Sequence, residues 1–167
     1  MQIEEVVVVL DELARQARDD EAVYRTAAVD ADELALTALS VNRAVQCRER
    51  AEELEGIAIL YRRGPRPLNY YVAPFARTMA WIATSLKRRD DREIVDTCKR
   101  HDDAARDAYE QVLSLALPVN LRLALRNHLA TMREGGAGLA HLRRAIHNRV
   151  NRCEARASQH SISAFGD

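Results

Sequence analysis

The sequence has few of the residues that interrupt a helix. It contains only 6 glycines and 4 prolines in 167 residues, and three of the prolines fall within residues 62–74. Because glycine and proline mark turns and helix ends, their scarcity favours a few long helices over many short strands. A chain of this length can bury the core of one domain. We therefore expect a single helical-bundle domain over residues 1–150. The polar tail, residues 151–167, lacks an apolar face and is expected to fray.

Cysteine is scarce, and no long apolar run occurs. The 3 cysteines are Cys47, Cys98 and Cys153, an odd number without a C-x-x-C pair, which is not the pattern of a disulfide framework. No segment approaches the roughly 18 apolar residues of a membrane span, and the acidic opening MQIEE is unlike a signal peptide. These absences predict a cytoplasmic protein with reduced thiols and no membrane contact.

The chain also lacks a net charge, although its charges are unevenly placed. The formal net charge is zero, so no overall field recruits nucleic acid or a membrane. Residues 1–61 carry 14 acids and 6 bases, a balance of −8, and residues 62–167 carry 11 acids and 19 bases, a balance of +8. The simplest use of this division is pairing between acidic and basic helices of one chain. A dimer surface is the second use, so the partners that we expect are a second copy or another protein.

Apolar side chains recur every three or four residues along most of the chain, which is the spacing of one helix face. This spacing predicts helices over residues 3–29, 33–61, 73–88, 91–116 and 119–150. The stripe predicted to be buried in the second of these is Leu34, Ala38, Val41, Val45, Leu54, Ala58 and Tyr61. In the last helix, the run GGAG at 135–138 is expected to interrupt the helix with a kink or to mark a close approach to a neighbouring helix.

The order of these helices predicts the fold. Two long helices are followed by a connection of roughly 30 residues that contains the short helix, and then by two more long helices. A bundle with one long connection of this kind has the ferritin-like arrangement. We therefore predict an all-α, ferritin-like four-helix bundle with a long crossover that carries a short extra helix.

Such bundles often hold a di-iron centre, and the histidines test for it. The ligand pattern is Glu-x-x-His on two of the helices, because residues three apart on a helix face the same point. The residues three positions before His101, His128, His141, His147 and His160 are Cys98, Leu125, Gly138, Arg144 and Ala157. None of them is acidic, so we expect no conventional di-iron site and no other cofactor.

Polar residues nevertheless fall on the predicted buried faces. They are Asp20, Arg43, Asp102 (or His101 if the phase of the helix shifts) with its neighbour Asp103, and His128. One interpretation is a salt-bridged layer in which Arg43 meets Asp20 and one of the two adjacent aspartates, because a buried carboxylate needs a partner. A second is a mononuclear metal site made by Asp20, Cys98, Asp102 and His128. The third is that these groups reach solvent.

With its helices placed, the chain resembles an uncharacterised bacterial family of ferritin-like four-helix-bundle proteins, known only as a domain of unknown function. The stretches that carry the resemblance are LDELARQARDDEAVYRTAA at 10–28, Arg43, and KRRDDREIVDTCKRHDDAARDAYEQVLSLALP at 87–118. The family pattern has Glu-Asp, an aromatic residue, a Trp and a His where this chain has Asp102-Asp103, Gln46, Met79 and Gly136. The resemblance implies a divergent member with a reduced polar centre, and it implies no reaction.

Other chemistry is not indicated. The sequence contains no G-x-S-x-G, Walker or G-x-G-x-x-G motif, and nothing supplies Cys98 with an orienting carboxylate, so we expect no catalytic residue. Nucleic-acid binding through residues 62–71 and the arginine-rich last helix is a weak alternative, because a single loop makes a small basic surface. The sequence favours a non-enzymatic structural or interaction protein, and the alternative function is a degenerate metal-binding bundle.

Overall fold

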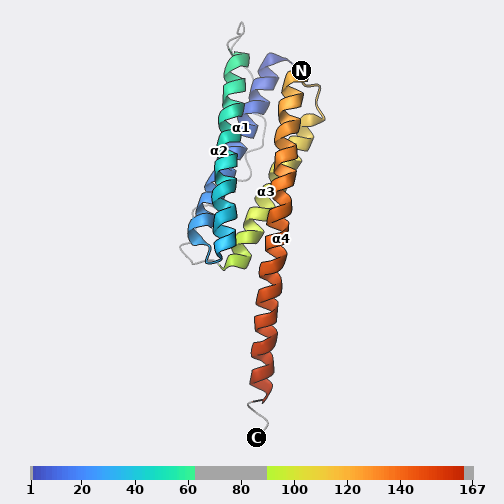
Figure 1. Cartoon of the computed structure of the whole chain (residues 1–167). Helices are drawn as coiled ribbons and strands as arrows, with labels where there is room; N and C mark the ends of the chain where they lie inside the picture. Colours follow the sequence, from blue (N-terminus) through green and yellow to red (C-terminus); the bar gives the residue numbers. More distant parts are fainter. Residues whose placement is uncertain (1, 63–89, 164–167) are drawn as a thin grey trace.

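The computed structural model describes residues 2–62 and 90–163, and it places four helices and no strand in them. They are α1 (Ile3–Asp30), α2 (Leu34–Arg62), α3 (Asp91–Leu113) and α4 (Val119–Ser163) (Figure 1). The prediction of an all-α, four-helix chain is confirmed. The short helix expected at 73–88 lies outside the described residues. None of the described helices has a stretch that is long and apolar enough to cross a membrane.

Local sequence accounts for where the helices begin and end. The Glu5 side chain accepts a hydrogen bond from the Gln2 backbone N–H at 2.8 Å, as part of a capping box at the start of α1. Asp90 precedes α3, and the acids in the first turn of α3 stabilise the helix because they lie at the positive end of its dipole. Pro118, which has no N–H to donate, lies between the end of α3 and the start of α4.

Helices α1 and α2 form one antiparallel pair, and α3 and α4 form another. A long connection joins the two pairs. The α1–α2 pair is fixed by ion pairs of Arg18 with Glu55 and of Arg62 with Asp11. At the other end of α1, the Asp32 backbone N–H donates to an Asp91 carboxylate oxygen at 2.9 Å. Helices α2 and α3 therefore point in the same direction, and the end of α2 and the start of α3 lie at opposite ends of the bundle.

The core has two apolar clusters with a polar layer between them. One cluster gathers around Leu10, Tyr109 and Leu125, and the other around Tyr24 and Leu139. On α1, Asp20 falls between the two clusters, as Asp102 does on α3 and Gly135 and Gly136 do on α4. On each of these three helices, the residues of the layer thus lie where the helix passes from one apolar cluster to the other.

The predicted buried face of α2 is wrong in the first half of the helix. Leu34, Val41 and Val45 are 80%, 52% and 38% exposed, and the buried residues of this half are Leu36, Ser40, Arg43, Ala44 and Cys47. The reason is that α2 carries two stripes at helical spacing. The stripe that turns inward consists mostly of small side chains, and it brings Arg43 to the centre of the bundle. The larger apolar residues are left on the outside.

Helix α4 is longer and more continuous than expected. It passes through GGAG without a break, and it continues to Ser163 (Figure 1). The polar segment 151–163 is therefore helical, whereas its composition suggested a frayed tail. It contains two arginines and two alanines, which are good helix formers, and it has no glycine or proline to end the helix. Beyond Arg149, which pairs with Glu33 at the start of α2, the helix projects past the end of the bundle.

Candidate functional site

The centre of the polar layer is an ion pair between α2 and α3. Arg43 and Asp102 are 4% and 2% exposed, and the guanidinium group of Arg43 donates a hydrogen bond to Asp102 Oδ1. Arg43 also lies over the ring of Tyr24, 5.5 Å from its centroid, and its Nη1 donates to Gln46 Oε1 at 3.3 Å. Buried charges of this kind are tolerated because each supplies the counter-charge of the other.

Helix α4 closes over this pair with two glycines. A Cβ atom at Gly135 would lie 2.5 Å from Arg43 Nη1, and one at Gly136 would lie 2.8 Å from Asp102 Oδ2. Both distances are shorter than van der Waals contact, so no side chain fits at either position without displacing a buried charge. The two glycines therefore allow the α4 backbone to approach the ion pair closely, and α4 adds no side chain to the layer there.

Some polar atoms of the layer are left without a hydrogen bond. Asp102 Oδ2, Arg43 Nε and Ser40 Oγ are buried and have no hydrogen-bond partner in the described part of the chain. Arg106 lies one turn after Asp102, and its Nε is 3.7 Å from Asp102 Oδ2. The Asp102 carboxylate is thus held between two guanidinium groups, and one of its oxygens is paired only by charge.

Asp20 lies in the same layer but pairs with a different residue. It is 2% exposed, and its Oδ1 lies 3.1 Å from Nδ1 of His101 and accepts a hydrogen bond from Gln16 Nε2 at 3.0 Å. The sequence placed His101 in the layer only as an alternative to Asp102, for a shifted phase of the helix, whereas both residues contribute to the layer in the structure. The sequence contained a signal for it, since it lies next to Asp102 and one turn from Cys98, but only the axial offset between α1 and α3 shows that it meets Asp20.

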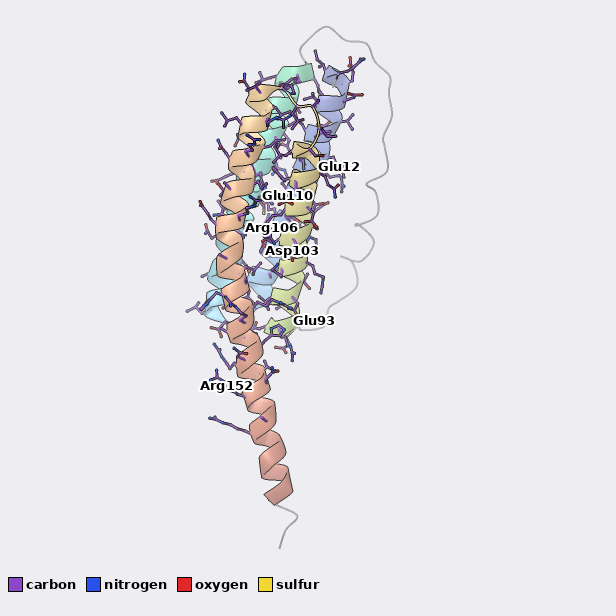
Figure 2. The ribbon with its side chains drawn as sticks, turned by 90° about the vertical axis from the view of Figure 1, so that its right-hand side faces the viewer. Glu12, Glu93, Asp103, Arg106, Glu110 and Arg152 are labelled. Atoms are coloured by element: carbon purple, nitrogen blue, oxygen red, sulfur yellow. The ribbon has the colours of Figure 1, made fainter. Side chains whose placement is uncertain are left out.

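Two predicted members of the layer lie elsewhere. Asp103 points away from the core with a 44% exposed side chain, and it pairs with Lys99 and Arg106 (Figure 2). His128 lies beside the first apolar cluster, where its Nδ1 is 3.1 Å from the Tyr109 hydroxyl and its Nε2 is 3.0 Å from Glu53.

The four residues of the alternative metal site are not brought together as a ligand set. Asp20 pairs with His101, Asp102 pairs with Arg43, and His128 contacts Tyr109. Cys98 is fully buried, and burial raises the pKa of its thiol to about 12. Within residues 2–62 and 90–163, no three His, Cys, Asp or Glu side chains converge in a group that could hold a metal ion.

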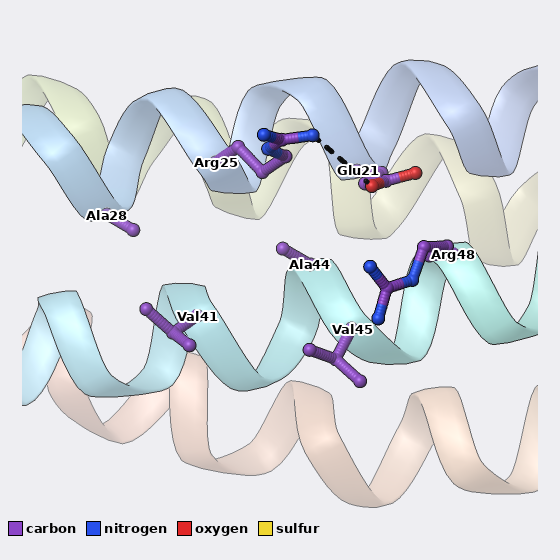
Figure 3. Close-up of a pocket in the computed structure, with 7 residues that line it drawn as sticks. All are labelled: Glu21, Arg25, Ala28, Val41, Ala44, Val45 and Arg48. Atoms are coloured by element: carbon purple, nitrogen blue, oxygen red, sulfur yellow. Dashed lines mark ion pairs between the residues drawn. The ribbon is translucent and has the colours of Figure 1, made fainter.

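A shallow groove lies on the outside of α1 and α2. Ala28, Val41, Ala44 and Val45 form its apolar part, and its charged rim is Glu21, Arg25 and Arg48 (Figure 3). Arg25 Nη1 lies 3.8 Å from Glu21 Oε1 across the rim. The groove includes two of the residues that the sequence analysis had assigned to the core of α2.

The fold and the layer define the class of protein. It is a four-helix bundle with an ion pair at its centre, and the glycines of α4 lie against that pair. The sequence model of one family, described as "Domain of unknown function (DUF2383)", matches residues 5–115. This match covers more than half of the chain, so the protein belongs to that family, and the predicted membership of an uncharacterised family is confirmed. The matched residues cover α2, α3 and all of α1 except its first two residues, and they end before α4. No curated protein matches the chain.

Proposed function

We propose that this protein is a non-enzymatic bundle of ferritin-like topology that lacks a conventional di-iron site and acts by binding protein surfaces. The observation that carries the proposal is the Arg43–Asp102 pair at the centre of the bundle. Arginine stays protonated at any physiological pH. A fixed cation at this position repels a metal ion. It also occupies the Asp102 carboxylate, which would otherwise be available as a metal ligand.

The shape of the layer supports the same conclusion. Helix α4 presents the Gly135 and Gly136 backbone to the layer, so it offers no ligand at that level. The second buried carboxylate, Asp20, is already hydrogen-bonded to His101 and Gln16. The polar groups of the layer thus contact one another, which is the arrangement of a structural core.

The topology supports the ferritin-like part of the proposal. Helices α2 and α3 run in the same direction, and Arg62 and Asp91 lie at opposite ends of the bundle. One long crossover between two antiparallel pairs distinguishes ferritin-like bundles from simple up-and-down bundles. We also propose a cytoplasmic location, which is supported by three free cysteines of which Cys47 and Cys98 are buried as thiols.

The surface supports an interaction role. Large apolar side chains on the outer face of α2 are exposed, and α4 projects beyond the bundle with Arg152 on its surface (Figure 2). Three other arginines of α4 form ion pairs within the chain, with Asp96, Glu110 and Glu33. Because these internal pairs reduce the basic character of α4, the charge favours a protein partner over nucleic acid.

Metal analysis tests the proposal. The full chain is incubated with Fe²⁺, Zn²⁺ or Mn²⁺, passed through a desalting column and measured by elemental analysis, beside the variants Asp20→Ala, Asp102→Ala and the surface control Asp103→Ala. We expect less than stoichiometric metal in all four proteins. One equivalent of metal per chain that is retained by the wild type and Asp103→Ala, but lost in both Asp20→Ala and Asp102→Ala, would establish the metal-binding alternative.

A further inference from the structure

The first half of α2 carries an apolar seam on its outer face. Leu34, Ala38, Val41 and Val45 are all exposed, and they follow one another at steps of four, three and four. This is the spacing of a coiled-coil seam, in which a second helix packs along the stripe. The groove beside the seam is lined by Ala28 and Ala44, whose small side chains allow a close approach (Figure 3).

The two ends of the seam differ in charge, with an exposed arginine at one end and a group of acids at the other. Arg48 is the next position of the repeat after Val45, and its side chain is 51% exposed. It forms an ion pair with Glu52 at 4.0 Å, and the exposed Glu49 follows it in the chain. At the other end, Asp30, Asp32 and Glu33 surround the turn between α1 and α2, and Glu33 is ion-paired with Arg149. The backbone N–H of Asp32 binds an Asp91 carboxylate oxygen there, which brings a further acid to this end.

We propose that a second copy of this chain covers the seam, with the two α2 helices packed antiparallel about a twofold axis between Ala38 and Val41. The proposal names the partner for the interaction role and so rests on the proposed function. Antiparallel packing about this axis places Leu34 against Val45 of the partner subunit, and Ala38 against Val41 of the partner subunit. Each apolar position of the seam then meets another apolar position.

Charge selects this arrangement over the parallel one. In the antiparallel register, Arg48 lies opposite the α1–α2 turn of the second copy, between Asp30 of the partner subunit and Asp32 of the partner subunit. A parallel pair would bring the two acidic turns together and the two Arg48 side chains together. Opposite charges across an interface favour its register, and like charges oppose it. In a twofold contact the same patch lies on both copies, so every favourable pairing is made twice.

Sedimentation velocity of the full chain over a range of concentrations tests the interface. We expect a reversible dimer that Val41→Glu and Arg48→Glu each weaken by about tenfold or more in Kd. Leu123→Glu is the control, because Leu123 is an exposed leucine on α4, 61% accessible and away from the seam. Adding Asp30→Arg to Arg48→Glu should restore the dimer, since the two charges are then exchanged. Restoration also shows that the single variant was folded.

Two results would overturn the inference. A chain that sediments only as an 18.8 kDa monomer would show that no second copy covers the seam. A dimer that persists in Val41→Glu and Arg48→Glu would place the interface elsewhere. Neither result depends on the metal analysis, so failure of this inference can be distinguished from failure of the proposed function.

Discussion

At the scale of single residues, the most consequential feature is an ion pair that is almost completely buried. The Arg43 guanidinium and the Asp102 carboxylate neutralise each other, and the ring of Tyr24 lies beside the cation. Replacing such a pair by apolar residues can be neutral, but removing one member leaves a buried charge without compensation. The pair is therefore expected to be far more sensitive to single substitutions than the ion pairs on the surface.

Substitution of Asp102 tests this sensitivity. We expect Asp102→Ala to lower the free energy of unfolding by about 3–5 kcal/mol, because Arg43 stays buried without its counter-charge. The matched control is Asp103→Ala, which removes an adjacent but partly exposed carboxylate and should cost no more than about 1 kcal/mol. Urea unfolding of the three proteins at neutral pH measures both effects. Equal losses of unfolding free energy in the two variants would show that the buried pair is no more sensitive to substitution than an ion pair on the surface.

At the scale of helices, the glycine pair in α4 reverses an ordinary rule. Glycine in an exposed helix interior costs about 0.5–1 kcal/mol relative to alanine. Gly56 in α2 fits that rule, since no atom lies within 4 Å of a Cβ atom built there. Gly136 does not, because its Cβ atom would lie 2.8 Å from the buried Asp102 Oδ2.

The same substitution is therefore expected to have opposite signs at the two positions. Gly56→Ala should raise the free energy of unfolding by about 0.5–1 kcal/mol. Gly136→Ala should lower it by about 1–3 kcal/mol, because the added methyl group overpacks a site that has no room. Thermal or urea unfolding measures both. Stabilisation by Gly136→Ala would show that α4 does not press on the ion pair.

The helices also show what could be predicted from sequence. The seam of α3 was predictable, because Ile94, Cys98, Ala105 and Tyr109 form one stripe of inward residues with no competing stripe. In α2 two stripes compete. Local periodicity favours the larger apolar residues, but the position of Arg43 against Asp102 decides which stripe is buried, and that contact joins residues 59 positions apart.

The centre of the bundle was predictable only in part, for the same reason. The phase of α3 favours Asp102 over Asp103 for an inward position, since Asp102 lies one turn after Cys98. The partner of Asp20 depends on how far α1 and α3 are displaced along their axes, and no local pattern encodes that displacement. The close approach at Gly135 and Gly136 likewise depends on which side chains face α4.

At the scale of the whole molecule, the core holds several weak acids in their protonated form. Burial raises the pKa of Cys47 to about 11 and that of Cys98 to about 12, from an ordinary value of 9.0. Burial likewise raises the pKa of the Tyr24 and Tyr109 hydroxyls above their ordinary value of 10.0. All four groups lie in the two apolar clusters on either side of the polar layer.

These shifts predict that the bundle loses stability in alkali. Below pH 9 both thiols are protonated in the folded and unfolded chains, so their contribution does not change with pH. Above pH 9 the unfolded chain releases the two protons while the folded chain keeps them, and the folded state becomes less favoured. The loss is about 1.4 kcal/mol per thiol for each pH unit between 9 and the folded pKa.

Urea unfolding at pH 8 and pH 10 measures this loss. We expect the free energy of unfolding to fall by about 3 kcal/mol between the two pH values from the thiols together. The double variant Cys47→Ala and Cys98→Ala should lose that part of the pH dependence, whatever its stability at pH 8, because only the change with pH reports the buried protons. The tyrosines remain in both proteins and supply a common background. If the wild type and the double variant change equally, the thiols ionise as readily in the folded chain as in the unfolded one. In that case, the core around the polar layer is open to water.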